Sequence, residues 1–191
     1  EYQRLGLERV KRVKIIDEWE YQVILGSVLG DANLRKTKTS SLFEESHTMR
    51  QEKYLLWKRD YALSKFNTMV NYKKNKIIHL WTEVSPIFND LRRTFYPNGK
   101  KIVTKEIIDK LKPLGIAVWF MDDGTLNLRA GGDISTDGFS KEKNDMIRNY
   151  FNERGIDCKV FKRKSGTYKI VFNQEGFKNF INIIKPFVHP S

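Results

Sequence analysis

The sequence predicts an α+β fold made of two similar halves joined in one chain. Three observations lead to this prediction. Patterns typical of helices and of strands alternate along the 191 residues, and the same series of patterns occurs twice. Two apolar segments that each end in aspartate occupy equivalent places in the two series. A chain of this length with 40% hydrophobic residues can bury a core, as one domain or as two small fused ones.

The first half begins with a helix after Asp17, which caps it in a capping box with Glu20. "SLFEESHT" (41–48) is extended, "QEKYLLWKRDYAL" (51–63) has helical spacing, and "TMVNYKKNKIIHLWT" (68–82) is a hairpin that turns at "KKNK". "SPIFNDLRRTFY" (85–96) is a short helix, with Ser85 as its cap and Pro86 in its first position.

The second half repeats this order after a short helix at 104–112. An apolar helix follows Pro113, and extended segments lie near 126–136. "SKEKNDMIRNYFNERG" (140–155) is a helix that Gly155 stops. "DCKVFKRKSGTYKIVFN" (157–173) is a hairpin that turns at "KSG", and "EGFKNFINIIKPF" (175–187) is the closing helix.

One offset, 92 residues, aligns the ends of the two halves, and the middle of each half needs small gaps. It pairs Asp31 with Asp123 in the apolar helices, and Leu80 with Phe172 in the hairpins. A duplication with pseudo-twofold symmetry explains this register. We therefore divide the chain into a basic N-terminal arm (1–16), an N-terminal half (17–103) and a C-terminal half (104–191).

The charge of the chain favours a polyanionic partner. Lys and Arg number 35 against 23 Asp and Glu, which gives a net charge of +12 and a pI near 9.7. Nucleic acid or an acidic membrane surface would suit this excess, and a merely soluble basic protein is the alternative. Cys158 is alone, so neither an internal disulfide nor a cysteine-based metal site is expected. No apolar run approaches the ~18–20 residues of a membrane span, so we expect no membrane partner.

The paired motif consists of "ILGSVLGDANL" (24–34) and "IAVWFMDDGTL" (116–126). In the first segment Gly26 and Gly30 share a helix face, where small residues allow a partner helix to approach closely. The second segment has Val118 and Asp122 at the corresponding places. These four residues are therefore the predicted helix interface, which is asymmetric.

Helices packed in this way would bring Asp31 and Asp123 together at their C-terminal ends. An acidic residue there costs about 0.3–1 kcal/mol, and two of them repel each other. The arrangement persists most easily with a cation between them, and oxygen ligands of this kind suit Mg²⁺. Alternatively, "DDGT" is a surface turn with Gly124 as its left-handed cap, but two such motifs in register favour the metal site.

These paired stretches resemble the LAGLIDADG homing endonuclease family, in its single-chain, two-motif, group I intron-encoded form. The resemblance is carried by "LGDA" and "WFMDDG" and extends from about Trp19 to Pro190. It implies an αββαββα repeat, with the motif helices central and two antiparallel sheets forming saddles in the DNA major groove. It also implies metal-assisted cleavage of both strands at a long site, leaving 3′ overhangs.

By match to the motif, Asp31 and Asp123 are the implied catalytic, metal-binding acids, with Mg²⁺ as cofactor and Mn²⁺ as a substitute. Asp122 falls at the helix interface and is not assigned to catalysis. The family also places a basic residue near each active centre, and Lys100 and Lys101 stand where relatives have it. The same two lysines would otherwise lie in a solvated loop. Their counterparts would fall at 192–193, beyond Ser191.

The saddles should supply the contacts to DNA, some to phosphates and some to base edges. The basic candidates lie near the first motif and in the two hairpins: Arg35, Lys36, Lys38, Lys73, Lys74, Lys76, Arg129, Lys162, Arg163, Lys164 and Lys169. His47 and His79 could also lie on a DNA-facing strand, although isolated histidines are more often structural.

The leading interpretation is a monomeric, Mg²⁺-dependent, site-specific double-strand DNA endonuclease. One alternative is a non-cleaving maturase of the same fold that binds intron RNA, and another is a DNA-binding regulator with an inactive site. Retention of both Asp31 and Asp123 favours the enzyme, since a pure binder needs no unneutralised acids at its centre. The Lys-, Asn- and Ile-rich composition suits an AT-rich genome, so we expect an intracellular protein, with mitochondrion or chloroplast as candidate compartments.

Overall fold

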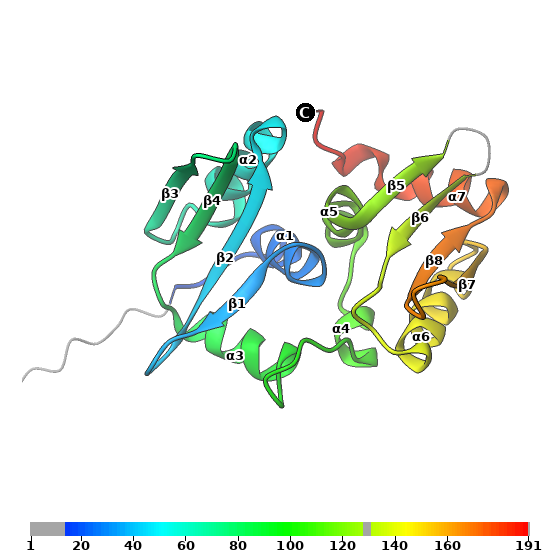
Figure 1. Cartoon of the computed structure of the whole chain (residues 1–191), viewed down its shortest axis with the longest axis horizontal. Coiled ribbons are helices and arrows are strands. Elements are labelled where there is room, and N and C mark those ends of the chain that lie inside the picture. Colours follow the sequence, from blue (N-terminus) through cyan, green and yellow to red (C-terminus); the bar gives the residue numbers. More distant parts are fainter. Residues whose placement is uncertain (1–13, 128–130, 191) are drawn as a thin grey trace, which may run out of the picture.

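The protein consists of two halves that repeat the same order of helices and strands (Figure 1). The computed structural model describes residues 14–127 and 131–190, so the predicted arm at 1–16 lies almost wholly outside the described residues. The first half comprises α1 (Glu18–Leu29), β1 (Asn33–Lys36), β2 (Ser41–Thr48), α2 (Glu52–Ala62), β3 (Thr68–Lys73), β4 (Ile77–Thr82) and α3 (Pro86–Phe95). After α4 (Lys105–Asp109), the second half comprises α5 (Pro113–Asp123), β5 (Gly124–Asn127), β6 (Gly131–Ser135), α6 (Lys141–Asn152), β7 (Cys158–Lys162), β8 (Tyr168–Phe172) and α7 (Gln174–Ile184).

The two sheets have the same topology. Their strand orders are β1-β2-β4-β3 and β5-β6-β8-β7, and all neighbouring strands are antiparallel. Leu80 of β4 lies opposite Glu45 of β2, and Phe172 of β8 lies opposite Gly132 of β6. Leu80 and Phe172, which the offset of 92 relates, thus lie on equivalent strands. The repeated order of elements and of strands confirms the predicted α+β fold with a duplicated αββαββα repeat.

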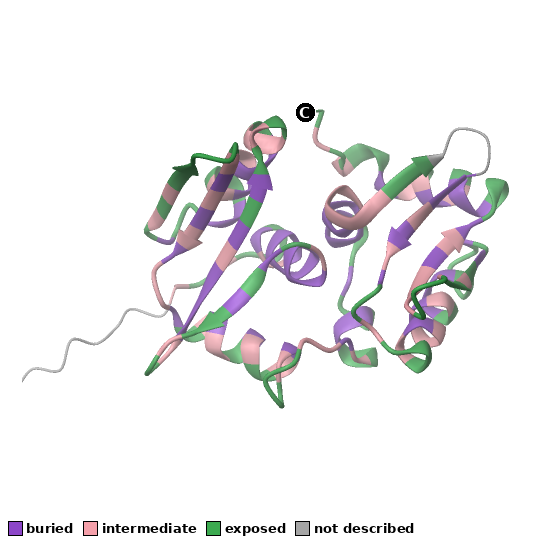
Figure 2. Cartoon of the chain, viewed as in Figure 1, coloured by how far each residue is buried: buried purple, intermediate pink, exposed green. Residues whose placement is uncertain are grey.

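Each sheet has an inner face packed against helices and an outer face. On β4, Ile78 and Leu80 are buried while His79 between them is half-buried, because successive side chains of a strand point to opposite faces. The outer face of the first sheet therefore carries His79 with its cross-strand partners Ser46 and Asn71. Figure 2 shows this change of burial along the strands.

Helices α1 and α5 pack against each other between the two sheets (Figure 1). The capping box of Asp17 and Glu20 is present at the start of α1. The side chain of Gln22 donates to the carbonyl of Lys110 at 2.8 Å and accepts from the N–H of Lys112 at 2.9 Å, which joins the beginnings of the two helices. These contacts fix the register in which the two motifs meet.

Glycines allow the close approach of α1 and α5 further along. A Cβ at Gly26 would lie 2.3 Å from the carbonyl oxygen of Gly115 and 2.9 Å from Cβ of Val118. A Cβ at Gly30 would lie 2.5 Å from Cβ of Asp122. The contacts advance in the same direction along both helices, so the two helices are parallel and their C-terminal ends meet.

The core is continuous across both halves. It includes Val28, Val118 and Trp119 of the central helices together with inner-face residues of both sheets, such as Leu80 and Phe172. Among the described helices, none is long and apolar enough to cross a bilayer.

Candidate active site

The two motif aspartates lie at adjoining ends of α1 and α5. Gly30 caps α1 and Asp31 follows it, while Asp123 is the last residue of α5. The side chain of Asp31 is 41% exposed, and Asp123 is half-buried. Burial and the negative charge of Asp31 raise the pKa of Asp123 to about 6. Burial also raises the pKa of Asp31. The two carboxylates therefore repel each other in a partly desolvated place, which favours a bound cation.

Lys101 lies next to the two motif aspartates, whereas Lys100 does not. The ammonium of Lys101 donates to the carbonyls of Gly30 and Ala32 at 3.0 and 3.1 Å, and so neutralises the negative end of α1. Burial lowers the pKa of Lys101, against the opposing effect of Asp123 and Asp31. Lys100 is exposed in the loop after α3. Of the two predicted lysines, the structure brings Lys101 to the aspartates.

Asp122 is buried in the helix interface, where Lys58 and Tyr54 of α2 hold it. Its Oδ1 accepts from Nζ of Lys58 and from the hydroxyl of Tyr54, both at 2.8 Å, and its Oδ2 accepts from Lys58 at 3.0 Å. Oδ2 is also 3.4 Å from the backbone N–H of Asp31. Burial raises the pKa of Asp122, and the Lys58 ammonium opposes that rise. Asp122 thus ties α2 and α5 to the end of α1.

Glu45 and His47 extend this polar network along the inner face of β2. The Lys58 ammonium lies 2.5 Å from Oε1 of Glu45, which is 2.7 Å from Nε2 of His47. Nδ1 of His47 faces Oδ2 of Asp31 at 3.7 Å. The pKa of Lys58 is raised because Asp122 and Glu45 outweigh its burial. The network therefore connects the buried lysine to the first motif aspartate.

Sequence reasoning missed Glu45, Lys58 and the role of His47. The signal was present in "SLFEESHT", where Glu45 and His47 alternate with Phe43 and so share its buried face. Lys58 similarly interrupts the apolar stripe of α2 that contains Leu55. A charged residue at a core position is informative because it must find a buried partner.

At the corresponding described residues, the second half does not repeat this network. By the sheet register, Glu45 and His47 correspond to Gly132 and Ile134, because Leu80 and Ile78 opposite them correspond to Phe172 and Ile170. At the offset of 92, Lys58 corresponds to Tyr150, whose hydroxyl donates to the carbonyl of Leu111 at 3.1 Å. The two motif aspartates thus have chemically different surroundings.

The basic candidates for DNA contacts divide between the outer faces and the turns. By register, Arg35 and Lys73 lie on the outer face of the first sheet, and Lys169 lies on that of the second. The others are at strand ends or in turns: Lys36, Lys38, Lys74, Lys76, Lys162, Arg163 and Lys164. Arg129 lies outside the described residues. Arg35 pairs with Glu44 at 2.6 Å and Lys169 with Asp133 at 2.8 Å, so acidic neighbours already neutralise part of this charge.

The donor set fits a divalent cation. Charged groups from both halves gather around the ends of α1 and α5: Asp31, Glu45, Asp122, Asp123, Lys58 and Lys101. While His47 is neutral, four carboxylates against two ammonium groups leave an excess of two negative charges. Carboxylate oxygens are the ligands that Mg²⁺ and Mn²⁺ prefer. Asp31, His47 and Asp122 also offer ligand atoms within 4.8 Å of one another.

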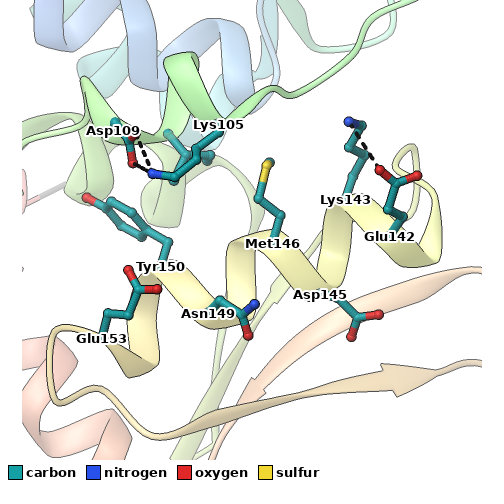
Figure 3. A pocket seen from close by; sticks show the side chains of 10 residues that line it. Lys105, Asp109, Glu142, Lys143, Asp145, Met146, Asn149, Tyr150 and Glu153 are labelled. Atoms are coloured by element: carbon teal, nitrogen blue, oxygen red, sulfur yellow. Dashed lines mark hydrogen bonds and ion pairs between the residues drawn. The ribbon is translucent and has the colours of Figure 1, made fainter.

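A separate pocket between α4 and α6 also carries carboxylates and lysines, but among the described residues the group that could hold a metal ion lies at the helix ends and not here (Figure 3). Its volume is about 360 Å³, and its rim carries the pair of Lys105 and Asp109 at 2.6 Å. Met146 and Tyr150 form its apolar wall. None of the motif residues lines it, so we assign the candidate active site to the helix ends and not to this pocket.

Curated proteins of similar sequence include a RecA protein and an mRNA maturase. The chain is 28% identical over 194 residues to "Protein RecA" of Mycolicibacterium flavescens, covering 92% of this chain and 46% of that protein. It is 27% identical over 194 residues to "Cytochrome b mRNA maturase bI2" of Debaryomyces hansenii, covering 93% of this chain and 73% of that protein. The chain thus spans about half the length of the RecA relative.

Two solved structures share the fold. The homing endonuclease I-WcaI bound to its DNA recognition sequence has a TM-score of 0.80 at 19% identity, covering 98% of this chain and 93% of that one. I-DmoI in complex with DNA and Mn has a TM-score of 0.57 at 12% identity, covering 87% and 96%. The model of the LAGLIDADG DNA endonuclease family matches residues 21–180, and the chain, with both motifs at the ends of its paired helices, belongs to that family.

Proposed function

We propose that the chain is a site-specific homing endonuclease that cleaves both strands of double-stranded DNA by metal-assisted phosphodiester hydrolysis. The observation that carries this proposal is the convergence of Asp31, Asp123 and Lys101 at the ends of the two central helices. One chain supplies both acids, which supports a monomer. Cleavage across the minor groove with 3′ overhangs is what the family resemblance implies for two acids placed in this way.

Each side chain has a role that follows from its place. Asp31 and Asp123 would each hold a divalent cation, Mg²⁺ or Mn²⁺, so that each motif has its own metal centre; the bound cation would supply Lewis-acid stabilisation of charge developing on the phosphate. Lys101 has three N–H donors and uses two on the carbonyls of Gly30 and Ala32. Its third is available to a phosphate oxygen. Asp122 and Lys58 hold the acids in position through the helix interface.

The outer faces of the two sheets would bind the duplex. Arg35, Lys73 and Lys169 stand on those faces, and the basic turns extend beyond their strands. Contacts to phosphates would position the DNA, while contacts to base edges would select its sequence. I-WcaI, which has the same fold, was solved bound to its DNA recognition sequence, which supports DNA as the partner.

A maturase that binds intron RNA is the second candidate. The similarity to the Debaryomyces maturase favours it, and it needs the basic surfaces but not two converging acids. Absence of DNA cleavage by the parent protein, together with binding to structured intron RNA, would identify a maturase.

The composition supports an AT-rich host genome, such as that of an organelle.

The test is a cleavage selection with matched variants. A plasmid library with a randomised insert is incubated with protein and Mg²⁺, and the linearised molecules are sequenced to obtain the target and its ends. We expect Asp31→Asn and Asp123→Asn each to abolish double-strand cleavage of that target, while both still bind it in Ca²⁺. Full cleavage by either variant would overturn the assignment of the active site.

A further inference from the structure

The imidazole of His47 is fixed between two carboxylates at the first motif. Its side chain is only 2% exposed, and Nε2 lies 2.7 Å from Oε1 of Glu45, which is fully buried. The Lys58 ammonium, 2.5 Å from the same oxygen, keeps Glu45 in its charged, accepting form. An ionised carboxylate only accepts hydrogen bonds, so Nε2 carries the proton. In the neutral ring Nδ1 is then unprotonated, and its lone pair faces Asp31.

Nδ1 of His47 and the carboxylate of Asp31 face each other at a distance that a shared metal ion can span. Oδ2 of Asp31 lies 3.7 Å from Nδ1, which is longer than a hydrogen bond. Bonds of about 2.0–2.2 Å from a metal ion to nitrogen and to oxygen can span such a separation. Metal-binding histidines almost always donate their other N–H to a carboxylate or carbonyl, as Nε2 does here to Glu45.

We propose that Nδ1 of His47 is a metal ligand, so that the first centre, formed by His47 and Asp31, is a mixed nitrogen and oxygen site that accepts transition metal ions. This inference rests on the proposed metal-dependent function and specifies the chemistry of one of its two centres. Imidazole suits ions such as Zn²⁺ and Ni²⁺, whereas Mg²⁺, Ca²⁺ and Mn²⁺ prefer oxygen. Asp122 is not a ligand in this arrangement, because Lys58 and Tyr54 occupy its oxygens.

The second centre offers an internal contrast. The residues that correspond to Glu45 and His47 in the sheet register are Gly132 and Ile134, which provide neither an imidazole nor a carboxylate behind it. A cation at Asp123 would therefore have only oxygen ligands, with the ammonium of Lys101 nearby. The two centres of one molecule should differ in their metal preference, and only the first should respond to changes at His47.

The alternative is that His47 is protonated and forms an ion pair with Asp31 and Glu45, without binding metal. NMR on protein with ¹⁵N-labelled histidine distinguishes the two cases. The chain has three histidines, and His79 on the outer face, bonded to Ser46 at 2.7 Å, is the internal control. Stoichiometric Zn²⁺ alone, a diamagnetic probe, is added to the DNA-free protein at mildly alkaline pH. We expect the Nδ1 resonance of His47 to shift while its Nε2 stays protonated and His79 is unchanged.

Affinity measurements by calorimetry complete the test. In His47→Gln we expect Zn²⁺ affinity to fall by at least ~10-fold, since loss of an outer-shell partner alone costs about 10–100-fold. Ca²⁺ affinity should stay within about threefold, and His79→Gln should match the parent for both ions. Thermal melting of each variant checks that it folds.

Two results would overturn the inference and separate it from the function proposed above. If Zn²⁺ binding requires Asp31 but leaves Nδ1 of His47 unshifted, His47 is not a ligand, although the metal-dependent function stands. If neither Zn²⁺ nor Ca²⁺ binds to the parent, alone or with the selected duplex, both the inference and the metal-dependent function fail.

Discussion

Lys58 shows how a single buried charge organises the site. Its side chain is 1% exposed, and its ammonium contacts Glu45 and Asp122, which are both fully buried. A buried ion pair adds little net stability, but removing one partner leaves an uncompensated charge. Lys58 therefore matters mainly because two carboxylates from different halves depend on it.

We expect Lys58→Met to lower the free energy of unfolding by about 3–5 kcal/mol, as measured by urea denaturation. Arg59→Ala on the same helix is the control. Arg59 pairs with Asp60 at the surface, and such a pair is worth only ~0–1 kcal/mol. Equal losses in the two variants would show that the Lys58 pairing is not the cause.

Asp123 gives a prediction about pH in metal-free protein. Burial, followed by the charge of Asp31, raises its native pKa from 3.8 to about 6. Between these values the native state holds a proton that the unfolded state has lost, so stability falls as pH rises. Above pH ~6 this cost is fully present. Asp123→Asn should then be more stable than the parent by about 1–3 kcal/mol, discounted for partial exposure, and equal to it below pH ~4.

The measurement is chemical denaturation in EDTA across this pH range. Adding a divalent cation should favour the parent instead, because the ion binds the native state and stabilises it. A difference between variant and parent that did not change with pH would contradict the raised pKa of Asp123.

The sequence was sufficient to predict that Asp31 and Asp123 lie at adjoining helix ends, because each ends an apolar segment and the spacing of these segments repeats. It did not predict that Glu45, Lys58 and His47 would meet, because the meeting depends on which face of β2 packs against which turn of α2. Periodicity gives the face of each element but not its partner. A polar residue on a buried face shows only that some partner must exist.

At the scale of elements, glycine at the helix contact decides how closely α1 and α5 approach. The prediction from four-residue spacing that Gly26 and Gly30 face the second helix near Val118 and Asp122 agrees with the contacts found. The sequence could not show that Gly30 caps α1 and is not inside it. Its replacement by alanine would therefore gain no helix propensity and would meet the side chain of Asp122.

We expect Gly26→Ala to destabilise the protein by about 1–3 kcal/mol, because its Cβ would lie 2.3 Å from a backbone oxygen. Parting the helices would also move Asp31 relative to Asp123, and a shift of about 1 Å can lower the rate 10²-fold. Melting and cleavage rate are measured together. Gly138→Ala is the control, since a Cβ there meets nothing within 4 Å. Parent-like behaviour of Gly26→Ala would show that the helices do not depend on this contact.

At the scale of the whole molecule, the two halves share their strand order but differ in the polar residues around the motif aspartates. Both sheets have the same strand order, as the duplication predicted from the offset of 92 and the family resemblance together imply. The polar network at Glu45 is replaced by Gly132 in the second half, where a Cβ would lie 2.3 Å from the ring of Phe177. Backbone symmetry follows from shared apolar positions, whereas each half can change its polar residues independently.

The distribution of charge over the whole molecule leads to a final prediction about DNA affinity. If the outer faces bind the duplex and neutralise ~6–10 phosphates, affinity should fall about 10³–10⁵-fold between 50 and 200 mM salt. The first hairpin places Lys73, Lys74 and Lys76 at one end of the first sheet, where all three are exposed. Replacing them with alanine should reduce the slope of log affinity against log salt by about 1–3.

Three lysines around α4 provide a control with the same loss of charge. Lys105, Lys110 and Lys112 form surface ion pairs with Asp109, Glu106 and Glu18, on elements outside both sheets. Because they lie off the outer faces, their replacement by alanine should leave the slope unchanged and alter affinity only slightly. Binding is measured in Ca²⁺ with the selected duplex, so that cleavage does not intervene. Equal changes in the two triple variants would mean that total charge, and not the outer faces, determines binding, and a nearly flat salt dependence would contradict an extended duplex contact altogether.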